Sequence, residues 1–152
     1  MKYAKFFCAL ILILALLPLQ VHGVEMDTKN SKTIICDDGS FIIVTLCEQV
    51  SRAGNEKNAS KTYTYYNALG SELWSATLYS TFTFDGTEYW TTASSISVDI
   101  QNTSWYVISQ SASHSGCGAT GDVTMGQKVL GVTVNKESVT ITLSCSPYGV
   151  IS

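Results

Sequence analysis

The chain has 152 residues, with 9 basic and 12 acidic side chains and a formal net charge of −3. Nucleic-acid binding needs a basic stripe to meet the phosphates, and the sequence contains none, so the composition argues against a nucleic-acid partner. The same acidic balance argues against an electrostatic attachment to anionic lipids.

Residues 1–23 have the layout of a secretory signal peptide. Lys2 and Lys5 precede an apolar run from Phe6 to Leu17, and Val21-His22-Gly23 provides a small-residue cleavage site. The apolar run has about 12 residues, whereas a membrane-spanning helix needs about 20. We therefore expect a secreted, extracellular protein without a stable membrane anchor; an uncleaved anchor is the alternative.

Residues 24–60 are expected to form a polar leader, a first hairpin and a linker. Asp37-Asp38-Gly39-Ser40 is a turn signal between two β-rich runs, Thr33–Cys36 and Phe41–Val50. The second run is apolar on both parities, which is typical of a strand buried on both faces. Ser51–Ser60 is polar and without periodicity, which predicts a loop or linker.

The clearest pattern lies in Lys61–Gly86, which predicts a second hairpin. In its second arm Trp74, Leu78 and Phe82 share one parity, while the other parity carries hydroxyl groups. A ribbon with one apolar face needs a second layer to cover that face.

The remaining residues continue the alternation, with a last hairpin closed by Asn135-Lys136. No helical window appears among them. The sequence therefore predicts an all-β, antiparallel β-sandwich, with a small β-barrel as the alternative. Residues 61–152 form the main part, and 24–152 are expected to be one domain. The later expected strands cover Ser95–Ile100, Trp105–Ser113, Asp122–Val134 and Val139–Cys145.

Four cysteines follow the predicted signal peptide, and an even number in an exported chain favours two disulfides. They are Cys36, Cys47, Cys117 and Cys145. The three possible connectivities stay open, although a tight first hairpin places Cys36 and Cys47 about 20 Å apart, too far for a bridge. A zinc site using these thiols and His114 is the rival interpretation, but no CxxC pair is present.

Candidate catalytic groups are few. After the signal peptide His114 is the single histidine, and no nucleophile motif surrounds it, so we interpret it as a surface loop residue. Four carboxylates could be combined on paper into a glycosidase pair, but they fit solvated turns and strands better; they are Asp85, Glu88, Asp99 and Asp122. Asp37–Ser40 lacks the alternating oxygen ligands of a calcium loop. We predict no enzymatic activity, no cofactor and no metal.

Aromatic side chains are numerous for one small core, so some are expected at the surface. Exposed tryptophan and tyrosine on a rigid sheet can bind sugar rings or a partner protein. Tyr89, Trp90 and Trp105 are the candidate ligand-binding residues, with a glycan, a cell-envelope component or another protein as the partner. The alternative is that these rings belong to the core and its rim.

Between Tyr89 and Gly121 the single charged side chain is Asp99, and Ser and Thr alternate with apolar residues. Uncharged amphipathic strands of this kind could insert as a membrane β-hairpin. The predicted function is thus a secreted, non-catalytic binding protein that uses an aromatic face. The alternative is a secreted antibacterial or pore-forming toxin-like protein.

Several segments also carry a resemblance. They are YYNALGSELW, TFTFDG, WYVISQSASHSG, ATGDVTM and TITLSCSPYG, with a weaker match at DDGSFIIVT. Over Lys61–Ser152 the chain resembles a family of small uncharacterised secreted β-rich proteins of Gram-positive, Clostridia-like bacteria. The resemblance implies an exported bacterial β domain, and it carries over no activity, ligand or functional residue.

The chain departs from that family at one cysteine. Members carry a cysteine near the position of Thr91 or Thr92, paired with the one matching Cys145, and here the position is threonine. The resemblance then implies Cys117 as the partner of Cys145, which leaves Cys36 and Cys47 for each other. That second pairing conflicts with a tight first hairpin.

Overall fold

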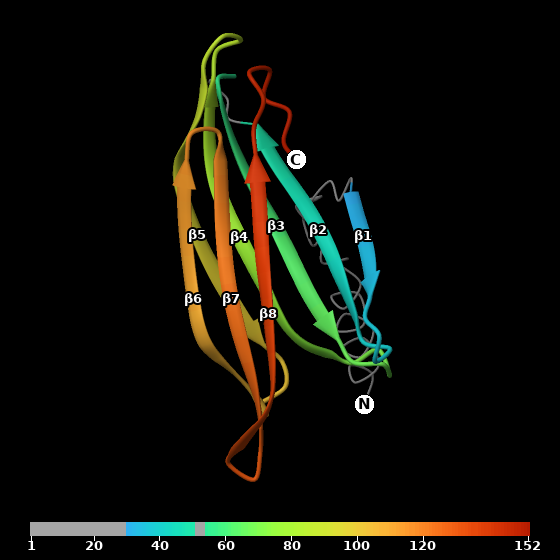
Figure 1. Ribbon diagram of the computed structural model, residues 1–152. Coiled ribbons are helices and arrows are strands. Elements are labelled where there is room, and N and C mark those ends of the chain that lie inside the picture. Colours follow the sequence, from blue (N-terminus) through green and yellow to red (C-terminus); the bar gives the residue numbers. More distant parts are fainter. Residues whose placement is uncertain (1–29, 51–53) are drawn as a thin grey trace, which may run out of the picture.

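The computed structural model describes residues 30–50 and 54–152, and the predicted signal peptide lies outside them. The described chain is built from antiparallel strands (Figure 1), and the predicted all-β sandwich is confirmed. No helix in the described part is long and apolar enough to cross a membrane. The strands are β1 (Asn30–Ile35), β2 (Phe41–Val50), β3 (Glu56–Tyr66), β4 (Glu72–Phe84), β5 (Tyr89–Ile100), β6 (Trp105–Ser115), β7 (Gly118–Val129) and β8 (Val132–Ser144).

The strands form two separate sheets in chain order. The five-stranded sheet has the order β1-β2-β3-β4-β5, and the three-stranded sheet has the order β6-β7-β8. Every neighbouring pair is antiparallel. The short β5–β6 connection takes the chain from one layer to the other. The first hairpin thereby belongs to the same sheet as the central hairpin, with Phe41 paired to Tyr66.

The central β3–β4 hairpin forms because its alternation and its turn chemistry agree. The Asn67 side-chain Oδ1 accepts hydrogen bonds from the backbone N–H groups of Leu69 (3.0 Å) and Ser71 (2.9 Å). Gly70 between them has φ = +79°, which a glycine adopts without steric cost. The asparagine thus fixes the turn, and the alternation then sends one face of each arm inward.

The core lies between the two sheets and is filled by the predicted apolar parity of β4. Trp74, Leu78 and Phe82 are fully buried, and Met125 and Ile141 meet them from the three-stranded sheet. Full burial of one such aliphatic or aromatic side chain contributes about 1.5–3 kcal/mol relative to exposure. This paired set of faces is therefore what holds the two layers together.

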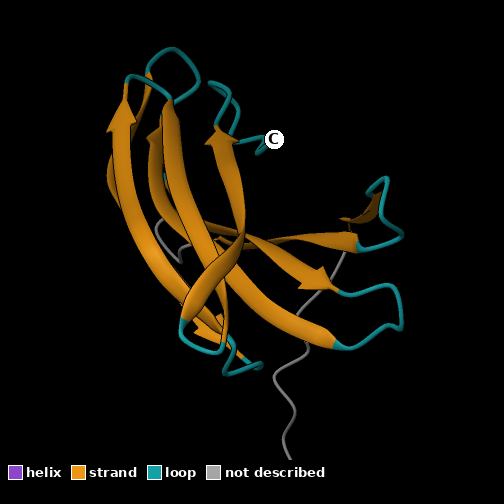
Figure 2. Cartoon of the chain, turned by 60° about the horizontal axis from the view of Figure 1, so that its bottom comes forward, coloured by secondary structure: helices purple, strands orange, loops and turns teal. Residues whose placement is uncertain are grey.

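The two layers differ in width, and the difference leaves part of one sheet uncovered. The three-stranded sheet packs on β3, β4 and β5, and within the described residues its backbone stays more than 8 Å from that of β1 and β2, measured between Cα atoms. Figure 2 shows β1 and β2 extending away from the three-stranded layer. Ile34 in β1 consequently remains 38% exposed. The predicted double-sided burial of β2 is found only in part, since its apolar side chains are half-buried on both faces.

Two predicted boundaries are corrected by the structure. The expected linker Ser51–Ser60 contains the start of β3, because Glu56 pairs with Thr83 and extends the ladder. The turn of the β7–β8 hairpin lies at Leu130-Gly131, whereas Asn135 and Lys136 lie inside β8, paired with β7.

The cysteines contradict one of the implied pairings. The backbone N–H of Cys36 donates to the carbonyl of Ser40 (2.8 Å), which closes the first hairpin tightly. Leu46, one residue before Cys47, pairs with Asn30 at the far end of the same hairpin. A bridge between Cys36 and Cys47 is therefore incompatible with this fold, since the two lie about 20 Å apart along β2. All four cysteines of the described chain carry free thiols.

Candidate binding cleft

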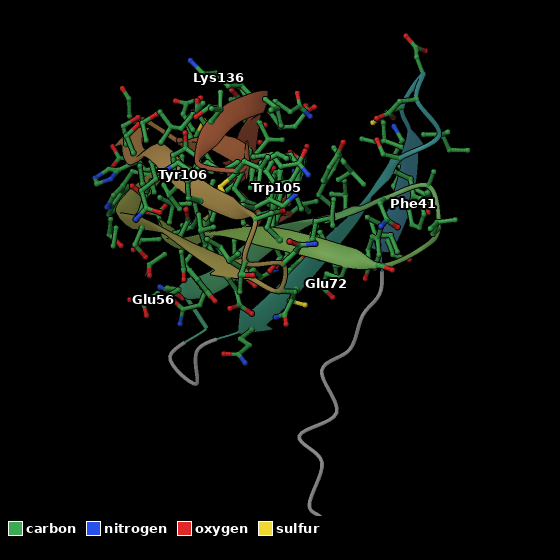
Figure 3. The ribbon with its side chains drawn as sticks, turned by 90° about the horizontal axis from the view of Figure 1, so that it is seen from below. Phe41, Glu56, Glu72, Trp105, Tyr106 and Lys136 are labelled. Carbon is green, nitrogen blue, oxygen red and sulfur yellow. The ribbon has the colours of Figure 1, made fainter. Side chains whose placement is uncertain are left out.

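One end of the molecule gathers four turns that are far apart in the sequence. Because consecutive strands are antiparallel, the β1–β2, β3–β4, β5–β6 and β7–β8 turns all fall at this end (Figure 1). A cleft of about 270 Å³ lies among them, which we call the polar cleft. Figure 3 looks onto this end and places Trp105 where the two sheets meet. The cleft is lined by Asp38, Ser40, Tyr65, Asn67, Ala68, Leu73, Asn102, Trp105, Gln127 and Asn135.

The floor of the polar cleft is the edge of a buried aromatic cluster. The ring of Tyr65 stacks on Trp74 at 5.3 Å between centroids and meets Trp105 edge-on at 5.9 Å. The two indoles lie 6.2 Å apart. Tyr65 and Trp105 are each only 4% exposed, so the cluster gives the cleft a rigid base and leaves the recognition surface to the polar rim.

A short hydrogen-bond chain joins the rim to that base. Ser40 donates to Asp38 Oδ1 from its backbone N–H (2.9 Å) and from its hydroxyl (2.5 Å). The Ser40 hydroxyl also lies 2.9 Å from the hydroxyl of Tyr65. The side-chain and backbone hydrogen bonds from Ser40 lower the pKa of Asp38, whereas burial raises the pKa of Tyr65. At neutral pH the chain thus ends in a carboxylate at the rim and a neutral phenol at the floor.

Amide side chains supply the rest of the rim. Asn67 and Asn102 use their Oδ1 atoms to cap their own turns, with Asn102 accepting from the backbone N–H of Ser104 at 2.9 Å. This arrangement leaves their amino groups as donors. The side chain of Gln127 makes no hydrogen bond within the described residues, so both ends of its amide can serve a ligand.

Electrostatically the polar cleft is nearly neutral. Of the described residues that line it, Asp38 alone carries a charge. Across the rim the side chain of Asn135 donates a hydrogen bond from Nδ2 to the carboxylate of Glu137 at 3.3 Å. Both residues lie in β8, so the Glu137 carboxylate is bonded within its own strand. Interspersed amide donors and hydroxyl acceptors of this kind suit a neutral ligand rich in hydroxyl groups.

The structure does not bring the three predicted ligand-binding residues together. Trp105 lies in the core at the cleft floor, which corrects the expectation that its ring reaches the surface. Tyr89 and Trp90 begin β5 at the opposite end, about 30 Å away along the strand. They are 37% and 41% exposed, and as neighbours in a strand they point to opposite faces of the sheet. They therefore do not form one platform.

His114 is also remote from the cleft. It lies near the end of β6, about 30 Å along the strand from Trp105. Its Nδ1 shares a hydrogen bond of 3.0 Å with the hydroxyl of Ser94, and its side chain is exposed. No cluster of three or more His, Cys, Asp or Glu residues suited to a metal ion occurs in residues 30–50 and 54–152.

A second, larger depression of about 380 Å³ lies on the face of the five-stranded sheet that points away from the core. Its lining includes Cys47, Ser60, Tyr79 and Ser95. Neighbouring hydroxyl and amide groups on this face bond one another, as Thr81 does with Asn58 at 2.8 Å. Tyr79 is 49% exposed and is its one large side chain. We prefer the polar cleft because it combines free amide donors with a rigid, buried aromatic base, whereas the one aromatic ring lining the outer depression, that of Tyr79, is half exposed.

The sequence did not predict the polar cleft, because its rim residues have the pattern of ordinary turn residues. Asn67, Asn102 and Asp38 carry the local signal of side chains that cap turns, and that signal contains nothing about a shared site. Only the topology shows that these turns converge.

Fold and cleft together define a two-layer antiparallel β-sandwich with a turn-lined cleft at one end. No protein-family model matches the chain, and neither characterised proteins nor solved structures yield a match. The resemblance to small secreted bacterial proteins stays a prediction.

Proposed function

We propose that the protein is a secreted, non-catalytic binding domain that takes a neutral, hydroxyl-rich ligand, a saccharide by class, in the polar cleft. The observation that carries the proposal is the set of free amide donors around a rigid aromatic base, namely the amino groups of Asn67 and Asn102 and the whole side-chain amide of Gln127. Saccharides offer closely spaced hydroxyls that both donate and accept, which amides match well.

The electrostatics of the cleft support a neutral ligand over a charged one. The one charged lining residue among those described, Asp38, would repel an anion, and its Oδ1 is already occupied by Ser40. A cation would have a single carboxylate at an exposed rim, which is too little to hold it specifically.

A binding role, as opposed to a catalytic one, is supported by the position of His114. A general acid or base must lie within hydrogen-bond reach of the reacting atom. His114 lies about 30 Å from the cleft along β6. Export is supported by the layout of residues 1–23, and an extracellular or cell-envelope saccharide is the ligand source that matches it.

The test uses Gln127→Ala against a panel of neutral oligosaccharides and peptidoglycan fragments, with binding measured by calorimetry. Because the Gln127 side chain makes no hydrogen bond in the described chain, its removal should leave the fold intact. Loss of one neutral hydrogen bond, about 1 kcal/mol, predicts roughly fivefold weaker binding.

Gln110→Ala is the matched control, since Gln110 is exposed on β6 outside the cleft lining. It should bind like the unaltered protein. Absence of binding to any saccharide on the panel, or equal losses in both variants, would refute the proposal.

A further inference from the structure

The β7–β8 hairpin ends in an exposed apolar segment, which we call the apolar tip. It consists of Val129, Leu130, Val132 and Val134. Leu130 is 100% exposed, and the three valines are 52%, 65% and 57% exposed in that order. Figure 1 shows this hairpin projecting beyond the other turns at its end of the molecule. Apolar side chains gathered on one projection need an apolar environment that the described chain does not supply.

The turn at the apolar tip carries a leucine at a position that disfavours it. Leu130 has φ = +50° and Gly131 has φ = +82°, so both central residues of the two-residue turn lie in the left-handed region. Asn-Gly is the favoured pair for such a turn, and a leucine there is strained. A strained, fully exposed leucine lowers the stability of the fold. Backbone strain of this kind is concentrated at functional sites, where residues interact with a ligand or partner.

The hairpin behind the tip is braced, so the tip is held away from the protein. The ring of Tyr106 lies against Gly126, where an added Cβ would come within 2.6 Å of it. The Tyr106 hydroxyl bonds the Thr133 hydroxyl at 2.7 Å, and Lys128 Nζ lies 4.2 Å from the ring centroid. These contacts tie β6, β7 and β8 together directly above the tip.

We propose that the apolar tip inserts into the interfacial region of a lipid bilayer. Val129 and Val132 pair with each other across the hairpin, so the strand backbone directly behind the turn enters the interface already hydrogen-bonded. Behind it Tyr106, Lys128 and Lys136 are amphipathic side chains at the depth where tyrosine rings and lysine stems favour the membrane–water boundary. A lipid surface fits a narrow projection better than a protein does, since a stable protein interface needs about 800 Å² per partner.

The driving force is apolar, not electrostatic. The whole chain carries a net charge of −3, so attraction to anionic headgroups is weak. Binding should therefore occur on zwitterionic phosphatidylcholine vesicles and persist at high salt. The inference is independent of the saccharide proposal, because the tip lies outside the lining of the polar cleft.

The test is flotation of residues 24–152, the chain expected after signal-peptide cleavage, with phosphatidylcholine vesicles, with and without phosphatidylglycerol. Leu130→Asp should weaken partitioning at least about tenfold, since burial of one leucine accounts for a factor of that size. Leu130→Asn should also weaken it while raising the melting temperature, because asparagine suits the turn. That opposite response separates lipid binding from misfolding.

Val150→Asp is the control, because Val150 is 65% exposed and follows the C-terminal end of β8, remote from the β7–β8 turn. It should float like the unaltered protein. Failure of the unaltered protein to float with either vesicle overturns the proposal, even where Leu130-dependent self-association is seen, since the tip then serves a protein contact. Binding that needs phosphatidylglycerol and vanishes in salt, or that is indifferent to both Leu130 substitutions, also overturns it.

Discussion

Tyr65 joins the hydrogen-bond chain of the polar cleft to the aromatic core, so its hydroxyl and its ring can be tested separately. In Tyr65→Phe the ring stays against Trp74 and Trp105, and only the 2.9 Å bond to Ser40 is lost. Ser40 keeps its hydroxyl bond to Asp38 at 2.5 Å, so no buried donor is stranded. The expected cost is about 1 kcal/mol of unfolding free energy.

Tyr65→Ala removes the ring as well and leaves a cavity beside both indoles. Large-to-small replacement of a buried aromatic costs about 3–5 kcal/mol. That loss is a large share of the 5–15 kcal/mol that stabilises a typical domain. The alanine variant should therefore unfold at much lower urea than the phenylalanine variant.

Urea denaturation followed by tryptophan fluorescence measures both costs, because Trp74 and Trp105 flank the altered side chain. Tyr148→Ala is the control; Tyr148 is 81% exposed, so its removal should change stability by less than about 0.5 kcal/mol. If Tyr65→Phe proves as damaging as Tyr65→Ala, the ring packing is not what stabilises this end. If Tyr65→Ala costs no more than the control, Tyr65 is not part of the core.

The other two predictions concern a carboxyl group and a thiol pair. Hydrogen bonds from Ser40 lower the pKa of Asp38 from its ordinary value of 3.8. These bonds therefore stabilise the fold at pH values above the pKa of Asp38 in the unfolded chain, and this stabilisation is lost as the pH falls through the lower pKa of the folded protein. In Ser40→Ala an NMR titration should move this pKa upward, and an unchanged value would contradict the bonds. Cys145 donates its backbone N–H to the Cys117 carbonyl (3.0 Å), so the chain segments that carry these two free thiols lie side by side. Air oxidation should link them and add about 3 kcal/mol; peptide mapping that finds another pairing would contradict the register.

The central hairpin could be predicted from sequence because its local and long-range requirements agree. A period of two on both arms and an asparagine-glycine turn specify the same register, and Trp74 and Phe82 are buried as expected. By contrast, the sequence predicted the turn of the last hairpin at Asn135-Lys136, whereas the structure has it at Leu130-Gly131. Asparagine and lysine look like turn residues, whereas a leucine in the left-handed region gives no turn signal.

The site was harder to predict because it depends on convergence. Trp105 begins a strand in which both parities carry apolar side chains, so the pattern does not say which face is inward. Only the packing of Trp105 against Tyr65 shows that its ring is buried. Asn67 lies in the β3–β4 turn and Asn102 in the β5–β6 connection between the sheets, and they line one cleft because both connections fall at the same end of the sandwich. No local sequence pattern relates residues in separate turns. The fold class could therefore be predicted from the sequence, whereas the polar cleft could not.

The most direct test of the binding account is an NMR titration of the full chain with neutral oligosaccharides, following side-chain amide signals. We predict that the amides of Gln127, Asn67 and Asn102 shift together and saturate, while signals around Tyr79 on the outer face of the five-stranded sheet stay unchanged. Shifts centred on Tyr79, or none at any of the three amides, would contradict it.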